Sequence, residues 1–194
     1  KREGKKRLFL REMQFLRTPA GGNLVELPDD PEFRSWMDCC VKKQKQDGYY
    51  YVIIPIPLGN IKAERLKILS QIVRNFGEGS VRTTQDQNMV LRWVHSSELH
   101  NLWNALNAYG FTTTRGIWRV ISCPGAATCN LGICNSRALA SAILERLNAN
   151  GLIPSEKIDI RISGCPNVCG QHLIGSIGLQ GGAKHVGTKL LPYY

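Results

Sequence analysis

Residues 123–129 read CPGAATC and residues 164–170 read GCPNVCG, so two short stretches hold four of the seven cysteines in the chain. The spacing is C-x5-C in the first stretch and C-x3-C in the second. Gly and Pro beside the cysteines favour turns, which let backbone amides approach the sulfurs. Thiolates are soft ligands, and a set of four selects zinc or an iron–sulfur cluster. The two stretches therefore predict a metal or cluster site and organise the second half of the chain.

The spacing favours a cluster over zinc, and both alternatives stay open at this point. Structural zinc usually binds cysteines in C-x2-C to C-x4-C knuckles, which a five-residue loop fits poorly. A single cysteine is most often a small buried apolar residue, and we interpret Cys39, Cys40 and Cys134 in this way. Cys39 and Cys40 are adjacent, so their side chains point in different directions and cannot readily bind one metal together.

The residues around the four cysteines resemble a known motif. Residues 121–132 (ISCPGAATCNLG) and 162–169 (ISGCPNVC) are similar to the cluster motif of the nitrite and sulfite reductase family. The resemblance, which covers about residues 47–180, implies a 4Fe–4S cluster and siroheme as cofactors. It implies that Cys169 also bridges the cluster to the siroheme iron. The implied cluster ligands are Cys123, Cys129, Cys165 and Cys169.

A second stretch, residues 82–88 (RTTQDQN), is by itself a polar hairpin tip and could equally be a solvated turn. Beside the cysteines it resembles the R-x-T-x-x-Q-N segment of the same family, whose side chains point at siroheme. A guanidinium can hold a carboxylate with its planar fork, and amides and hydroxyls can donate hydrogen bonds to others. The residues implied to contact siroheme are Arg82, Thr84, Gln87, Asn88 and Asn167.

The order of apolar patterns predicts an α+β fold. Residues 1–46 are predicted to be a connecting arm that contains a short helix over 31–41. From residue 47 to 115 the pattern is β-α-β-β-α, which resembles the ferredoxin-like half-domain of the family. Residues 116–194 are predicted to form a truncated siroheme and 4Fe–4S domain. Its expected elements are strands over 118–122, 157–163 and 174–179 and a helix over 137–148 capped by Ser136.

Composition narrows the class of protein further. With 194 residues and 43% hydrophobic residues, the chain can form one domain or two small ones. No apolar run approaches the length of a membrane-spanning helix, and the basic start lacks the apolar region of a secretory signal. The odd number of cysteines argues against a disulfide framework and for a reducing compartment, which we take as the cytoplasm. Because no initiator Met is present, we expect a piece of a longer protein.

The net charge of +10 suits an anionic or acidic partner. We find no nucleic-acid-binding motif in the sequence, and we interpret the four histidines, His95, His100, His172 and His185, as surface or structural residues. The resemblance implies six-electron reduction of nitrite to ammonia or of sulfite to sulfide. It implies an electron donor that is a ferredoxin or a flavoprotein.

In the family, the basic residues around the bound anion come largely from a half that would precede Lys1. This missing half is therefore an expected partner, and the piece alone is expected to be inactive. The alternative function is a 4Fe–4S electron-transfer or accessory module without siroheme.

Overall fold

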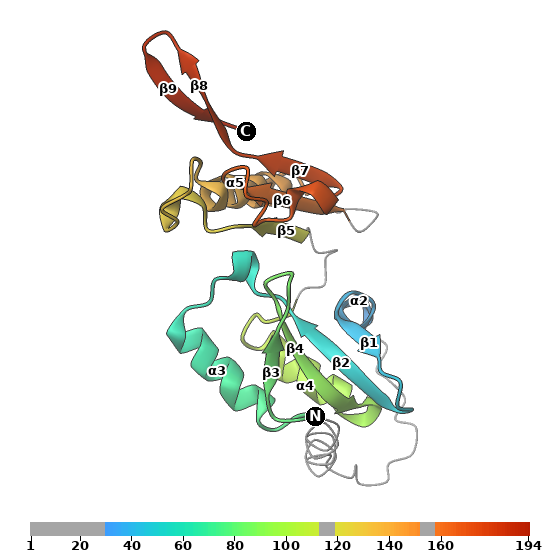
Figure 1. Cartoon of the computed structure of the whole chain (residues 1–194). Helices are drawn as coiled ribbons and strands as arrows, with labels where there is room; N and C mark the ends of the chain where they lie inside the picture. Colours follow the sequence, from blue (N-terminus) through green and yellow to red (C-terminus); the bar gives the residue numbers. More distant parts are fainter. Residues whose placement is uncertain (1–29, 113–118, 152–157) are drawn as a thin grey trace. The chain divides into compact units, whose positions relative to one another are not determined.

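The computed structural model describes residues 30–112, 119–151 and 158–194 (Figure 1). The chain divides into two units, Lys1–Thr114 and Arg115–Tyr194, each with its own sheet. Both units mix helices and strands, which confirms the predicted α+β class. In these described ranges, no helix is both long and apolar enough to cross a membrane.

The first unit contains a four-stranded antiparallel sheet in the order β1-β2-β4-β3. Helices α2 and α3 both contact α4, and aromatic rings join α2 to α4. The β-α-β-β-α order predicted from the sequence is present as β2, α3, β3, β4 and α4. The bounds are α2 Pro31–Cys40, β1 Val41–Lys43, β2 Tyr49–Ile54, α3 Ala63–Val73, β3 Val81–Thr83, β4 Met89–His95 and α4 Leu99–Asn107.

Alternation along β2 and β4 directs one face of the sheet into the core. Val52, Ile54 and Leu91 are fully buried, as are Leu69 from α3 and Leu102 from α4. Apolar residues at helical spacing on α3 and α4 supply the other side of this core. The core therefore depends on the periodicities that the sequence shows.

Helix α2 and strand β1 pack into the first unit, whereas the sequence predicted them as part of a connecting arm. Asp30 caps α2, because its Oδ1 accepts hydrogen bonds from the backbone amides of Glu32 at 2.8 Å and Phe33 at 3.4 Å. Phe33, Trp36 and Cys40 are buried on one face of this helix. Burial, with a smaller contribution from Cys39, raises the pKa of Cys40 to about 12, which fits an inert apolar thiol. Residues 1–29 of the predicted arm lie outside the described residues.

The second unit contains a three-stranded parallel sheet in the order β5-β6-β7, and α5 packs against β5 and β6. A two-stranded antiparallel hairpin, β8–β9, follows it, and the sequence analysis did not predict this hairpin. Trp118 and Lys157, the predicted first residues of two strands, lie outside the described residues. The bounds are β5 Arg119–Ser122, α5 Ser136–Ala149, β6 Asp159–Ser163, β7 Ile177–Gln180, β8 Gly182–Val186 and β9 Lys189–Tyr193.

Two predicted helix caps are wrong. The cap of α5 is Asn135, whose Oδ1 accepts a hydrogen bond from the Ala138 amide at 3.1 Å, and Ser136 lies inside the helix. The sequence also predicts Ser96 as the cap of the helix that contains Leu99, but the capping side chain is His95, at the start of the 3-10 turn Ser96–Glu98 that leads into α4: its Nδ1 accepts from the Ser97 amide at 3.3 Å. In both cases the residue one position earlier has the extended or non-helical backbone that a cap requires.

Candidate functional site

The two cysteine loops leave the parallel sheet at the same edge. Strands β5 and β6 are parallel neighbours with Ser122 opposite Ile162, so both run toward one edge. Cys123 follows β5 directly, and Cys165 follows β6 after one glycine. Ligand sites of open sheets with parallel strands commonly lie at this carboxyl edge. Residues far apart in the sequence are thereby brought to one place.

Backbone hydrogen bonds join the two loops. The Gly164 carbonyl accepts from the amides of Cys134 at 2.9 Å and Ile133 at 3.1 Å, and the Gly164 amide donates to the Cys123 Sγ at 3.1 Å. A Cβ on Gly164 would lie 2.6 Å from the Cys134 carbonyl oxygen, so only glycine permits this approach. The loops therefore form one connected support for their sulfurs.

The four sulfurs differ in exposure. All four cysteines have free thiols: those of Cys123 and Cys165 are buried, and those of Cys129 and Cys169 are exposed. Cys123 Sγ also lies 3.3 Å from Ser136 Oγ. Within the ranges that the structure describes, no three His, Cys, Asp or Glu side chains converge closely enough to hold a single metal ion.

The donor set fits the chemistry of an iron–sulfur cluster. Such a cluster takes four cysteine thiolates as ligands, and hydrogen bonds to sulfur are among the features that set its potential. Two linked loops supply four thiols here, and one sulfur already accepts a backbone N–H.

The backbone beside Cys169 is strained. Val168 has φ 60° and Gln171 has φ 57°, in the left-handed region that is a genuine outlier for a β-branched residue such as Val. The Gln171 amide donates to the Val168 carbonyl at 2.7 Å, which closes a tight turn around Cys169. Strain of this kind clusters at functional sites, because the surrounding structure must hold it in place.

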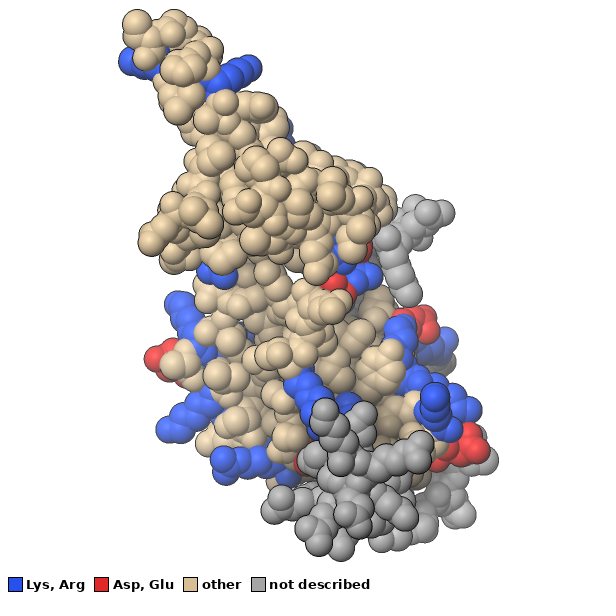
Figure 2. Space-filling view, viewed as in Figure 1, with Lys and Arg blue, Asp and Glu red and all other residues tan. Residues whose placement is uncertain are grey.

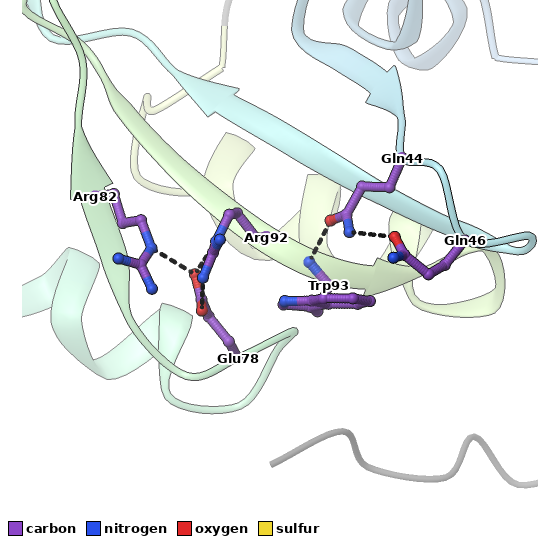
Figure 3. Close-up of polar contacts among 6 residues, drawn as sticks. All are labelled: Gln44, Gln46, Glu78, Arg82, Arg92 and Trp93. Atoms are coloured by element: carbon purple, nitrogen blue, oxygen red, sulfur yellow. Dashed lines mark hydrogen bonds and ion pairs between the residues drawn. The ribbon is translucent and has the colours of Figure 1, made fainter. Parts of the chain in front are cut away.

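Arg82, from the second motif, lies on β3 of the first unit and contacts a buried carboxylate (Figure 3). Its Nε is 3.6 Å from Glu78 Oε1, and its side chain is 52% exposed. Arg92 binds the same carboxylate with two hydrogen bonds of 2.9 and 2.8 Å. Burial alone would raise the pKa of Glu78, but the hydrogen bonds and charges of Arg92 and Arg82 outweigh it and lower that pKa.

The other residues of the second motif hold the β3–β4 hairpin tip. Thr84 Oγ1 accepts from the Asn88 amide at 3.1 Å, and Asn88 Oδ1 accepts from the Ile56 amide at 3.0 Å. Gln87 has φ 61° and packs against Gly59, where an added Cβ would lie 2.9 Å from the Gln87 Cβ. These contacts give the motif a local structural role. The motif belongs to the first unit, and the cysteines and Asn167 belong to the second.

A family model matches the part of the chain that holds the second motif. Residues 42–109 match the family model described as the nitrite/sulfite reductase ferredoxin-like half domain. The chain belongs to the nitrite and sulfite reductase family.

Relatives include a ferredoxin–nitrite reductase from Synechococcus elongatus, which is 31% identical over 78% of this chain and 30% of its own length. The chloroplastic ferredoxin–nitrite reductase of Spinacia oleracea is 28% identical over 73% of this chain and 24% of its length. An assimilatory-type sulfite reductase from Nitratidesulfovibrio vulgaris is 27% identical over 72% of this chain and 64% of its length. The chain thus spans about a third or less of the nitrite reductases it matches.

Among solved structures, the Mycobacterium tuberculosis NirA protein matches with a TM-score of 0.66 and 23% identity, over 89% of this chain and 31% of that one. This likeness shows that the two chains share a fold.

Sequence reasoning missed several residues around the cysteine loops of this family member. The Cys134 thiol donates toward the carbonyl oxygens of Gly182 at 3.4 Å and Tyr193 at 3.2 Å. These contacts connect the segment after the first cysteine loop to the hairpin β8–β9. Burial, then the charges of Cys134 and Cys123, raise the pKa of Tyr194 to about 12, although a hydrogen bond with Ser136 opposes the shift. His172 was also missed as a buried partner of Ser163. Asp159, Arg161 and Ser163 alternate along β6, but the same pattern is typical of a solvent-facing side of a strand and gave no signal of burial.

Proposed function

We propose that the chain forms the cluster-binding portion of a siroheme-dependent nitrite or sulfite reductase. In this proposal Cys123, Cys129, Cys165 and Cys169 would hold a 4Fe–4S cluster, and Cys169 would also be a ligand of siroheme. The single observation that carries this proposal is the junction of the two cysteine loops at one edge of the parallel sheet, with the Gly164 N–H donating to the Cys123 sulfur. When bound, the cluster supplies electrons singly and siroheme supplies the metal at which the anion is reduced.

The protein groups in this proposal act by holding and shielding the sulfurs. The Gly164 amide donates a hydrogen bond to Cys123 Sγ, and an N–H donor at this position would stabilise the negative charge of a sulfur that binds the cluster. Burial of Cys123 and Cys165 keeps water from two of the four sulfurs. The exposed Cys169 is the one that lies on a strained turn, and its exposure suits a sulfur that must reach a second group.

The second motif supplies contacts to the siroheme carboxylates in this proposal. Arg82 is half-exposed, so its guanidinium can contact a carboxylate while it stays near Glu78. The Asn88 oxygen binds the Ile56 amide, so Asn88 offers its Nδ2 donor to a ligand. Thr84 and Gln87 contribute from the same hairpin tip, and Asn167 contributes from the loop between Cys165 and Cys169.

The reaction proposed is the six-electron reduction of nitrite to ammonia, with sulfite to sulfide as the second candidate. The printed names of the nitrite reductase relatives support nitrite and a ferredoxin donor, and a flavoprotein donor suits the sulfite alternative. The net charge of +10 favours an acidic donor and an anionic substrate. We propose a reducing compartment such as the cytoplasm. Anion-binding residues from the rest of the enzyme are required, so the 194-residue chain alone is expected to be inactive.

Anaerobic reconstitution tests the proposal. The chain is incubated with ferrous iron and sulfide, and iron, acid-labile sulfide and zinc are measured; about four irons and four sulfides per chain are expected. Cys169→Ser is expected to lose most of the cluster, and Cys39→Ser, in helix α2 of the first unit, is the matched control that should keep it. One zinc without labile sulfide, or a full cluster in the Cys169 variant, would contradict the ligand assignment.

Absorption spectra then separate the two functional alternatives. Chain produced in cells that make siroheme should show tetrapyrrole bands that disappear in Cys169→Ser. A cluster spectrum without tetrapyrrole bands, even when the chain is joined to the rest of its enzyme, would favour the electron-transfer module instead.

A further inference from the structure

One face of the central strand β6 is polar and buried. Asp159, Arg161 and Ser163 alternate along β6, so they share this face. Arg161 is only 5% exposed and Ser163 only 1%. The segment after Cys169 covers them, because a Cβ on Gly175 would lie 3.0 Å from the Arg161 Cβ. A buried polar face is costly unless each group is hydrogen-bonded, so its partners indicate its role.

Ser163 binds both sides of the turn that follows Cys169. Its Oγ accepts from the Gly170 amide at 3.0 Å and lies 2.8 Å from His172 Nδ1. The hydroxyl can do both, because it accepts from the amide and pairs with the imidazole nitrogen in either tautomer. His172 is 7% exposed, so the pair is shielded from water.

Arg161 binds the residue between these two contacts. Its Nη1 donates to Gln171 Oε1 at 2.7 Å, and its Nη2 donates to Asp159 Oδ2 at 3.2 Å. Asp159 Oδ1 in turn forms an ion pair with Arg119 Nε on β5, at a distance of 3.2 Å. Side chains of β6 therefore hydrogen-bond to three consecutive residues after Cys169. Gln171, the middle one, has the left-handed conformation.

We propose that His172 and Arg161, acting through Ser163 and Gln171, are positioning residues for the Cys169 sulfur. Among the described residues, Cys169 Sγ makes one weak polar contact, 3.7 Å from the Asn167 carbonyl oxygen, so the backbone on either side sets the position of this sulfur. Groups that orient a ligand in this way typically change metal affinity tenfold to a hundredfold when they are removed. The inference rests on the proposed role of Cys169 as a ligand.

Cluster retention tests this inference. His172→Ala removes the pair with Ser163, and His172→Asn keeps an amide group where Nδ1 lies, so it is the conservative rescue. After reconstitution, loss of cluster iron to a chelator should be about tenfold or more faster in His172→Ala, with a shifted midpoint potential, and near wild type in His172→Asn. His100→Ala is the matched control, because His100 packs on Phe33 and Trp103 in the first unit.

A second variant separates loss of the positioning contact from misfolding of the unit. Gln171 is only half-buried, so Gln171→Ala removes the Arg161 contact with less risk to folding, and it should change retention and potential in the same direction. Unchanged retention and potential in both Gln171→Ala and His172→Ala would overturn the inference. If Cys169→Ser loses its cluster in the same series, the proposed function still stands, whereas a full cluster in Cys169→Ser removes the proposed function itself.

Hydrogen exchange on the metal-free chain gives a readout that needs no cluster. The Gly170 amide should exchange faster in His172→Ala than in wild type, while the amides of the first cysteine loop, such as Ala126, keep their rates. His172→Asn should restore protection of Gly170. Equal acceleration in both loops would mean that His172 only stabilises the unit, which would overturn a positioning role.

Discussion

At the scale of single residues, the structure departs from local preference where the chemistry is proposed. Val168 has a positive φ, which costs an ordinary residue about 1–2 kcal/mol, and a β-branched side chain is the least suited to it. The pattern that predicted the cysteine ligands gave no sign of this strain. A strained residue between Cys165 and Cys169 is expected if the surrounding contacts serve the position of a sulfur rather than stability alone.

Replacement of Val168 by glycine should therefore stabilise the metal-free chain. Glycine adopts φ 60° without steric cost, so Val168→Gly is expected to raise the free energy of unfolding of the second unit by about 1 kcal/mol. Thermal unfolding, monitored by a signal from the second unit, measures the change in the free energy of unfolding. The same substitution at Val186, in the exposed strand β8, should instead lower stability by about 0.5–1 kcal/mol. A loss of equal size at both positions would show that Val168 is not strained.

At the scale of elements, a β-bulge in β4 organises the buried carboxylate of the first unit. Arg92 and Trp93 lie where the β2–β4 register shifts, and Trp93 has φ 60°. The backbone groups that the bulge releases have other partners. Gln44 Oε1 accepts from the Trp93 amide at 2.8 Å (Figure 3). The Arg92 carbonyl accepts from the Glu78 amide at 3.1 Å. The bulge thus places the Arg92 guanidinium beside the Glu78 carboxylate.

The lowered pKa of Glu78 makes part of the stability dependent on pH. In the unfolded chain the carboxyl has its ordinary pKa of 4.5, and in the folded chain its pKa is lower, so the stabilisation is fully present above about pH 4.5. It is lost as the pH falls through the folded pKa. Glu78→Gln should lower stability by about 1–3 kcal/mol at pH 7, because it removes hydrogen bonds to a charged group.

Thermal unfolding between pH 7 and pH 3 measures this effect. The difference between wild type and Glu78→Gln is expected to shrink as the pH falls below about 4.5. Glu64→Gln, on the surface of α3, is the control and should change stability by less than about 0.5 kcal/mol. A difference that stays constant with pH would mean that the charge of Glu78 contributes nothing.

Elements with a strong periodic pattern could be predicted from the sequence. The buried polar contacts, the exposed hairpin and the helix caps could not. Alternation and helical spacing predicted β2, α3, β4 and α4, and the residues before the cysteines predicted the strands β5 and β6 that lead into both cysteine loops. The sequence could not show that β6 has a polar buried face, because Asp159 and Arg161 look like solvent-facing residues until Gln171 and Arg119 are brought to them. Hairpin β8–β9 was missed because its strands are almost wholly exposed, so no buried alternation marks them. Caps were misplaced by one residue because several polar residues compete at each helix start.

At the scale of the whole chain, the two units differ in how their parts come together. In the first unit all strand pairs are antiparallel: short loops join β1 to β2 and β3 to β4, whereas β2 pairs with β4 across α3 and β3. The second unit depends on parallel strands whose partners lie far apart in the sequence, and both cysteine loops extend from it. Lys and Arg side chains are prominent in Figure 2, in agreement with the net charge of +10. The four cysteines that we propose as ligands thus belong to the second unit, which is the unit that a bound cluster would stabilise most.

Cluster binding should therefore protect one unit and not the other. A ligand that binds only the folded state stabilises the structure that forms its site. After reconstitution with iron and sulfide, amides of β5 and β6, such as Val120 and Ile162, should exchange with solvent at least about tenfold more slowly, whereas Val52 and Leu91 in the first unit should keep their rates. The Cys169→Ser chain, treated identically, is the control and should show no protection. Equal slowing in both units would mean that they unfold as one cooperative body, and no slowing in either would mean that the loops of the second unit do not hold the cluster.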